Sequence, residues 1–127
     1  MKSIVLLISI FLFSSCILTT EEIYIYDQYV YVKGLNVISN ERGNLKLHLK
    51  VEMPTVCHQF HRREIKQNRD TIFVRYFSKV RKDEVCIFLY ALVDLHDNFK
   101  LEPSRSYYFR FYAGDGITLD TLIYLKN

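Results

Sequence analysis

A strict alternation of apolar and polar side chains is the feature that most constrains how this chain folds. In residues 45–52, Lys, His or Glu follows each apolar residue: Leu45, Leu47, Leu49 and Val51. Residues 107–113 repeat the alternation with aromatic side chains, Tyr107, Phe109 and Phe111 on one side and Tyr108 and Tyr112 on the other. Side chains of a strand point alternately to its two faces, so this period of two predicts half-buried strands. No stretch carries a convincing helical period, and the pattern predicts an all-β chain.

Turn signals divide the rest of the chain into further strands. Residues 40–44 and 67–70 are turn clusters, Pro54 ends a strand, and Asp115-Gly116 is a strong hairpin signal. The most apolar segment, Val85 to Leu95, is typical of a strand buried on both faces, with a short helix as the alternative. We expect seven or eight strands in a single domain over residues 23–127.

One segment near the C-terminus resembles a known architecture. Its spacing is Leu101-x-Pro103-x-x-x-Tyr107-x-Phe109-x-Phe111-x-Ala113-x-x-Gly116. This resembles the penultimate strand of fibronectin type III and related immunoglobulin-like domains, where a tyrosine corner precedes an alternating strand. The resemblance implies an antiparallel immunoglobulin-like or fibronectin III-like sandwich. It extends to architecture alone, because the chain has no Trp for the core position that fibronectin type III domains fill with one.

The N-terminus has the layout of an export signal. Lys2 precedes an apolar run from Ile4 to Phe13, which is too short for a permanent membrane-spanning helix of about 20 residues. Phe13-Ser14-Ser15-Cys16 resembles a bacterial lipobox, although its first position is usually Leu, Val or Ile, and ordinary signal cleavage is the alternative. The resemblance implies a signal peptide over residues 1–15, acylation of Cys16 and a tether over residues 16–22. Ile17, in place of Asp, is compatible with sorting to the outer membrane.

Two further cysteines predict a disulfide. An exported domain meets an oxidising compartment, so pairing of Cys57 with Cys86 is the expectation, and two separate buried thiols are the alternative. The sequences around them, "MPTVCHQF" and "VCIF", are similar to small lipoproteins of uncharacterised function with immunoglobulin-like folds.

No motif nominates an enzyme. Cys57-His58-x-x-His61 has metal-ligand residue types, but on a strand the two histidines point to opposite faces, and an oxidised Cys57 cannot ligate. Nucleophilic catalysis by Cys57 meets the same objection. We therefore expect no catalytic residue, no metal and no cofactor.

The near-neutral net charge of the chain argues against a protein that binds polyanions such as nucleic acids. Without Lys2, the 17 Lys and Arg fall to 16, against 14 Asp and Glu. We expect no nucleic acid partner.

Two surfaces are candidates for binding. One is a basic hairpin with Arg62, Arg63, Lys66 and Arg69, and the other is the turn Gly114, Asp115 and Gly116. Charges on the hairpin also suit a simple role in protecting a strand edge from aggregation. A tyrosine stripe near the anchor suits a sugar-stacking or interface surface, but the preferred interpretation is a strand packed on the core: Tyr24, Tyr26, Tyr29 and Tyr31.

These features predict a non-catalytic lipoprotein of the bacterial cell envelope, anchored in the outer membrane, that binds an envelope protein or glycan. The alternatives are an immunoglobulin-like protease inhibitor and a structural or accessory subunit of an envelope complex.

Overall fold

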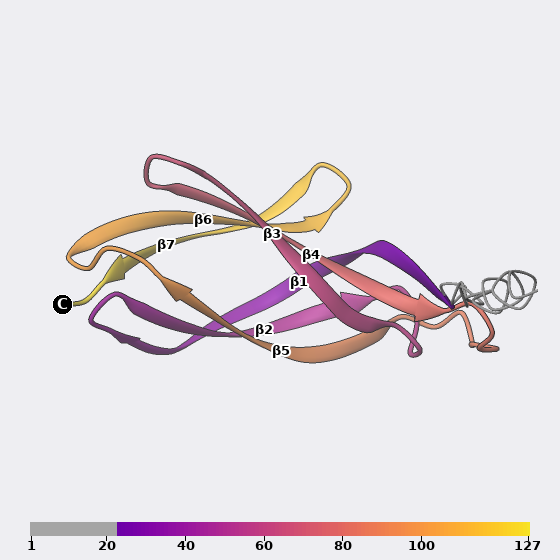
Figure 1. Ribbon diagram of the computed structural model, residues 1–127. Coiled ribbons are helices and arrows are strands. Elements are labelled where there is room, and N and C mark those ends of the chain that lie inside the picture. Colours follow the sequence, from indigo (N-terminus) through magenta and orange to yellow (C-terminus); the bar gives the residue numbers. More distant parts are fainter. Residues whose placement is uncertain (1–22) are drawn as a thin grey trace, which may run out of the picture.

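The computed structural model describes residues 23–127 as seven β-strands (Figure 1). They are β1 (Tyr24–Glu41), β2 (Asn44–Met53), β3 (Gln59–Asn68), β4 (Thr71–Arg81), β5 (Ala91–Lys100), β6 (Arg105–Gly114) and β7 (Ile117–Leu125). The all-β class and the expected number of strands are confirmed. The signal peptide over residues 1–15, Cys16 and the tether over residues 16–22 lie outside the described residues. Within residues 23–127 no helix is long and apolar enough to cross a membrane.

The strands form a curled sheet in the order β5-β2-β1-β4-β6-β7, with β3 also paired to β4. β1 is long enough to belong to both halves: Tyr24–Val30 pair with β4, and Tyr31–Glu41 pair with β2. Its register shifts between Ile25 and Gln28, where Asp27 has a φ of 59°. Bulges of this kind bend a strand. The change of partner from β4 to β2 falls between Val30 and Tyr31, and a second register shift follows it between Val32 and Gly34.

One pairing departs from the expected antiparallel arrangement. β4 and β6 are parallel, with Thr71 opposite Tyr108 and Val74 opposite Phe111. The other pairs among the described strands are antiparallel, so the sheet is mixed. The alternation in each strand is the same for either direction, and it carries no information on this point.

The core lies between the two halves of the curled sheet. The alternating apolar residues of β2 and of β6 face inward and are buried. They are Leu45, Leu47, Leu49 and Val51 in β2, and Tyr107, Phe109 and Phe111 in β6. The ring of Phe99 in β5 meets that of Phe109 in β6 edge to face, with 5.3 Å between centroids. β5 and β6 are not neighbours in the sheet, so this contact joins its two halves.

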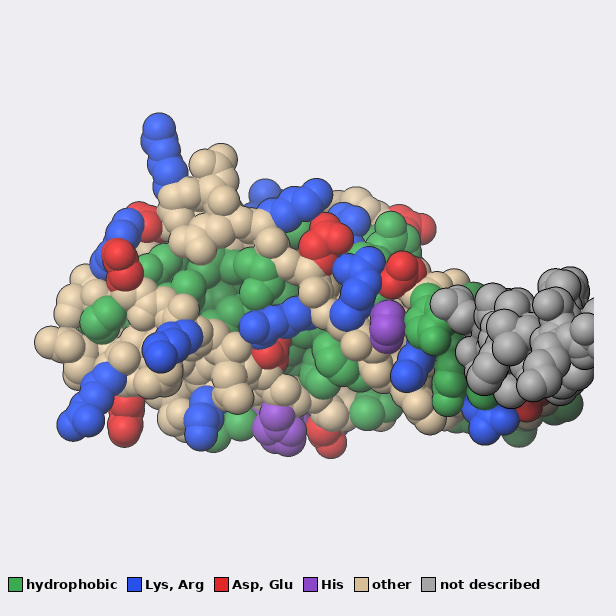
Figure 2. Space-filling model, in the orientation of Figure 1, with side chains coloured by type: hydrophobic (Ala, Val, Ile, Leu, Met, Phe, Trp, Pro, Cys, Tyr) green, Lys and Arg blue, Asp and Glu red, His purple; other side chains and the backbone are tan. Residues whose placement is uncertain are grey.

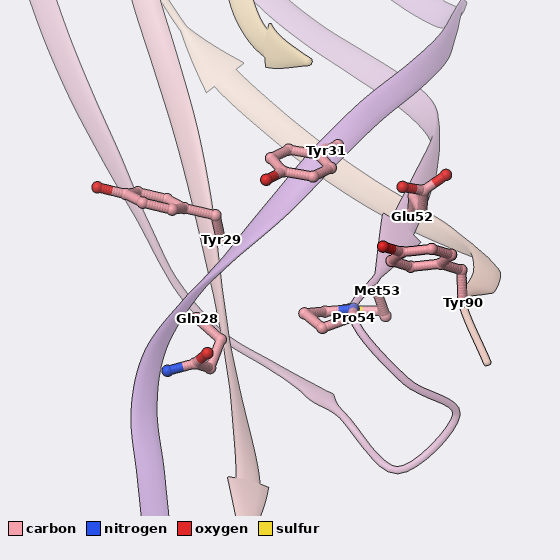
Figure 3. Close-up of a pocket in the computed structure, with 7 residues that line it drawn as sticks. All are labelled: Gln28, Tyr29, Tyr31, Glu52, Met53, Pro54 and Tyr90. Carbon is pink, nitrogen blue, oxygen red and sulfur yellow. The ribbon is translucent and has the colours of Figure 1, made fainter. Parts of the chain in front are cut away.

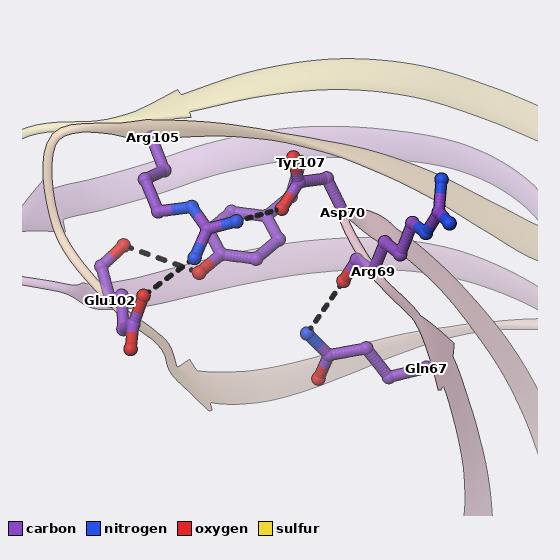
Figure 4. Close-up of polar contacts among 6 residues, drawn as sticks. All are labelled: Gln67, Arg69, Asp70, Glu102, Arg105 and Tyr107. Atoms are coloured by element: carbon purple, nitrogen blue, oxygen red, sulfur yellow. Dashed lines mark hydrogen bonds and ion pairs between the residues drawn. The ribbon is translucent and has the colours of Figure 1, made fainter.

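The β5–β6 connection carries the expected tyrosine corner geometry (Figure 4). The Tyr107 hydroxyl donates to the backbone carbonyl of Glu102 at 3.4 Å. Arg105 donates to the carboxylates of both Glu102 and Asp70, which joins this connection to the β3–β4 turn. The connection also passes close to Gly43, where a Cβ would lie 2.2 Å from the carbonyl oxygen of Leu101. With a φ of 78° at Gly43, only glycine fits there.

A polar network ties β3 and β4 to β5. The Tyr76 hydroxyl donates to one carboxylate oxygen of Asp97 at 2.6 Å, and the Arg63 guanidinium donates to the other. Arg63 also donates to the carbonyl of Asn98 at 3.0 Å and lies over the ring of Phe99. Burial, together with the Asp97 carboxylate, raises the pKa of Tyr76 far above its usual value. The Tyr76 hydroxyl therefore stays protonated and remains a donor.

Replacing Asp97 should destabilise the fold measurably. We expect Asp97→Ala to lower the free energy of unfolding in urea by about 2 kcal/mol, because the Tyr76 hydroxyl and Arg63 lose their shared acceptor. The control is Asp120→Ala, which removes a more exposed partner of Arg110 and should cost less than about 1 kcal/mol. Equal losses in the two variants would contradict this account of the network.

The predicted disulfide is confirmed. The sulfur atoms of Cys57, in the β2–β3 connection, and Cys86, in the β4–β5 connection, lie at bonding distance. The bond ties together two loops at one end of the sheet.

The expectation of a strand over Val85 to Leu95 that is buried on both faces is wrong. The first half of this segment is not a strand, and in the second half Leu92 is 64% and Val93 40% exposed. β5 begins only at Ala91, and the residues from Val85 to Tyr90 form a connection without strand structure. Phe88 is 96% exposed. An apolar run alone does not distinguish a core strand from an apolar loop.

Candidate functional site: an aromatic cavity

A cavity of about 270 Å³ opens beside β1 (Figure 3). Its lining comes from three parts of the chain: Gln28, Tyr29 and Tyr31 of β1, Glu52, Met53 and Pro54 at the end of β2, and Tyr90 just before β5. Figure 3 shows the rings of Tyr29, Tyr31 and Tyr90 set around the opening, with the Glu52 carboxylate beside Tyr90. The site therefore combines aromatic surfaces with a carboxylate and an amide.

The strand pattern places these tyrosines outside the core. Val30 and Val32 of β1 are buried, so Tyr29 and Tyr31 point to the opposite face. Tyr29 is 44% exposed. The interpretation that the tyrosine stripe packs into the core is therefore wrong for these two residues.

A second layer of aromatic and cationic groups supports the cavity. Tyr112 of β6 packs against Tyr29 and Tyr31, with centroid distances of 5.1 and 5.5 Å. The Arg75 guanidinium lies 4.9 Å from the Tyr112 centroid and 5.4 Å from that of Tyr29. Its Nε is the buried side-chain nitrogen without a hydrogen-bond partner in the described part of the chain. Stacking on the rings is thus the main contact of this guanidinium, and it holds Tyr29 and Tyr112 in place.

Two tyrosines at the cavity, Tyr31 in its lining and Tyr112 behind it, have a raised pKa. Burial raises the pKa of Tyr31, and the Asp115 carboxylate raises it further. Burial also raises the pKa of Tyr112, which donates to Asp115 at 3.0 Å. Glu52 forms a long ion pair with Lys33, whose Nζ lies 3.9 Å from the Glu52 carboxylate. This distance leaves Glu52 free to accept hydrogen bonds from a ligand.

The predicted turn Gly114, Asp115 and Gly116 adjoins the cavity. It connects β6 to β7, and Asp115 meets the tyrosine cluster through its hydrogen bond with Tyr112. The hairpin signal in the sequence thus identifies a segment that lies behind the cavity wall.

The predicted basic hairpin does not form a surface of unpaired positive charge, because carboxylates pair with most of its basic side chains. Arg62 donates to Asp27 at 2.9 Å, Arg63 is bound to Asp97, and Lys66 lies 3.6 Å from Glu64. Arg69 is exposed at the β3–β4 turn. Figure 2 shows acidic and basic side chains interspersed over the face that it draws. The pairing is consistent with a charged strand edge.

The Cys57-His58-x-x-His61 motif does not form a cluster of ligands. Cys57 is in the disulfide, His58 Nδ1 lies 2.8 Å from the Thr55 hydroxyl, and His61 packs on the ring of Tyr26. Partial burial lowers the pKa of His58. Across residues 23–127, no group of three or more His, Cys, Asp or Glu side chains is arranged to hold a metal ion.

Comparisons with known proteins add no relative. No family model, no curated protein and no solved structure matches the chain.

Half of the cavity could not be anticipated from the sequence. Glu52 pairs with Tyr31 in the β1–β2 register, but in the sequence it is one more polar position of an alternating strand. Tyr90 is part of an apolar run. The sequence signal that could have placed Glu52 at the cavity is the β1–β2 hairpin. Its turn at residues 42–43 sets the register that brings the end of β2 beside the tyrosines of β1.

Proposed function

We propose that this chain is a lipid-anchored, non-catalytic binding module of the bacterial cell envelope, and that it binds a sugar unit of an envelope glycan in the aromatic cavity. The single observation that carries the proposal is the cavity of about 270 Å³, with three tyrosines beside a carboxylate and an amide. Binding sites combine apolar and aromatic walls with a few placed polar groups in this way.

The proposed ligand class follows from the chemistry of the lining. A sugar ring offers an apolar C–H face, which stacks on a tyrosine ring, and hydroxyl groups, which donate to a carboxylate. Tyr29 and Tyr90 supply exposed rings, at 44% and 70% exposure. Glu52 supplies the acceptor, and Gln28 supplies an amide that both donates and accepts.

The proposed anchor rests on the N-terminal sequence. The basic start, the short apolar run and Ser14-Ser15-Cys16 support acylation at Cys16. The Cys57–Cys86 disulfide supports export to an oxidising compartment. Placement in the outer membrane follows from Ile17 and is part of the same proposal.

A titration with a set of N-acetylhexosamine oligomers tests the binding site. We expect Tyr90→Ala to weaken binding by about tenfold, since an aromatic anchor contributes more than about 1 kcal/mol and each 1.4 kcal/mol is tenfold. Saturation-transfer NMR on the sugar protons, followed by calorimetry, measures the effect.

Tyr124→Ala is the matched control. Tyr124 is 56% exposed, and its backbone carbonyl accepts from Asn40 beside the β1–β2 turn, away from the cavity. This variant should bind like the unmodified chain. Unchanged binding by Tyr90→Ala, or an equal loss in both variants, would rule out the cavity as the sugar site.

A further inference from the structure

The connection between β4 and β5 exposes an apolar surface. Four apolar side chains in five residues extend from the fold, with exposures of 102% for Val85, 76% for Ile87, 96% for Phe88 and 62% for Leu89. We call these residues the apolar loop. Single exposed apolar residues are common on protein surfaces, but a contiguous group marks a contact with a partner or a membrane.

The apolar loop is held in its exposed position. Cys86, between Val85 and Ile87, is bonded to Cys57 of the β2–β3 connection and lies 3.3 Å from the Thr55 hydroxyl. Within the loop, the Leu89 amide donates to the Ile87 carbonyl at 2.8 Å, which makes a tight turn. The disulfide therefore fixes the loop at the end of the sheet, with the side chains on either side of Cys86 pointing outward.

The start of the described chain lies beside the apolar loop. The Lys82 amide donates to the Ile23 carbonyl at 2.7 Å, and Ile25 pairs with Val80. Figure 1 places the start of β1 and the β4–β5 connection at the same end of the molecule. Cys16 precedes Ile23 by seven positions, which span at most about 25 Å when extended. An acyl chain on Cys16 thus holds this end of the domain close to the bilayer.

Charges around the apolar loop suit a membrane surface. Lys79, Arg81 and Lys82 precede it, and Asp83 and Glu84 are the acidic residues at its start. Arg81 is paired with Asp83 at 2.9 Å, and Lys79 lies over the ring of Tyr24. The three positive and two negative charges leave a small positive balance, which does not oppose approach to neutral or anionic headgroups.

We propose that the apolar loop inserts into the lipid bilayer as a second membrane contact, which orients the domain relative to its anchor. This inference rests on the proposed lipid anchor and is independent of the sugar site. The free energy of membrane binding grows with each apolar group that is buried in the bilayer, and the acyl groups on Cys16 and the apolar loop lie at the same end of the domain. Apolar side chains of interfacial segments lie about 5–10 Å deep, at the boundary of headgroups and acyl chains.

A single tryptophan tests the inference, because the chain has no Trp of its own. The full chain carrying Phe88→Trp, processed in a bacterial host, is reconstituted into phosphatidylcholine–phosphatidylglycerol vesicles whose acyl chains are brominated near the headgroup. We expect a blue shift and a loss of emission from the introduced indole relative to vesicles without bromine. The matched control is Tyr124→Trp, placed at the opposite end of the sheet, which should show neither change.

The outcomes separate the loop from the anchor. If the Phe88→Trp chain floats with the vesicles but its indole is not quenched, the inference is overturned and the anchor stays intact. A blue shift without quenching places position 88 against protein, and also overturns it. A chain that does not float overturns both proposals.

Quenching of the indole in Phe88→Trp, together with weaker flotation of Ile87→Asp than of Leu122→Asp, supports insertion. Leu122 is a similarly exposed residue of β7, at 69% against 76% for Ile87, so the two substitutions differ in position and not in the kind of side chain they remove. Equal flotation of these two variants would count against a membrane contact by the loop.

Discussion

Removing the Cys57–Cys86 disulfide by the double substitution Cys57→Ser and Cys86→Ser is expected to lower the free energy of unfolding by about 3 to 4 kcal/mol. The two cysteines are 29 positions apart. In the chain-entropy model, opening a loop of that length raises the conformational entropy of the unfolded chain, which lowers the free energy of unfolding by this amount. Urea denaturation of the oxidised chain and of the variant measures the difference. The loss is a large part of the stability of a domain of this size.

The control for this experiment is reductant. The double variant should show the same unfolding midpoint with and without dithiothreitol, whereas the unmodified chain should shift to the midpoint of the variant when reduced. A reduced chain as stable as the oxidised one would show that the bond contributes nothing to folding.

Phe109→Ala should cost about 3 to 5 kcal/mol, the range measured for large aromatic residues removed from a core. Phe109 is fully buried, and it contacts Phe99 across the core and Phe111 along its own strand. Its removal leaves a cavity between the two halves of the sheet, which these rigid rings cannot fill. Chemical denaturation, read by circular dichroism, checks the value.

Tyr108→Ala tests whether position on the strand decides the effect. Tyr108 is the neighbour of Phe109 on the opposite face and is 39% exposed. Its replacement should cost about 1 kcal/mol or less, the usual range for exposed positions. Similar losses at the two positions would contradict the inward and outward assignment of β6.

The local pattern of residues predicts most of the strands. Residues 45–51 and 107–113 alternate because each strand has one face in the core, and the structure places Leu47 and Phe109 there with no exposure. The Asp115-Gly116 turn separates β6 and β7 where the hairpin signal lies. In each case the information is carried by neighbouring residues, as it is in any half-buried antiparallel hairpin.

Pairing between distant strands is beyond what the sequence predicts. The parallel contact of β4 with β6 joins residues 71–74 to residues 108–111, and neither strand carries a signal for direction. The wrong prediction of a buried strand before β5 has a related cause. An apolar sequence indicates that burying the segment is favourable, but it does not say whether the fold can bury it. Val85 and Phe88 are exposed because of where the disulfide and the ends of β4 and β5 place the loop.

The candidate site is predicted in part. The sequence identifies the tyrosine stripe of β1, with sugar stacking as one interpretation, and Tyr29 and Tyr31 do line the cavity. Glu52 and Tyr90 reach it through the β1–β2 register and the β4–β5 connection. A site assembled from three separate segments is visible only once their pairing is known.

The lipid anchor at Cys16 and the Cys57–Cys86 disulfide can be tested together. The most direct test is the intact mass of the full chain extracted from the membranes of a lipoprotein-processing bacterium, after alkylation with and without prior reduction. We predict the mass of residues 16–127 plus acyl groups, with Cys57 and Cys86 alkylated only after reduction. A mass without acyl groups would contradict the anchor, and alkylation of Cys57 before reduction would contradict the disulfide.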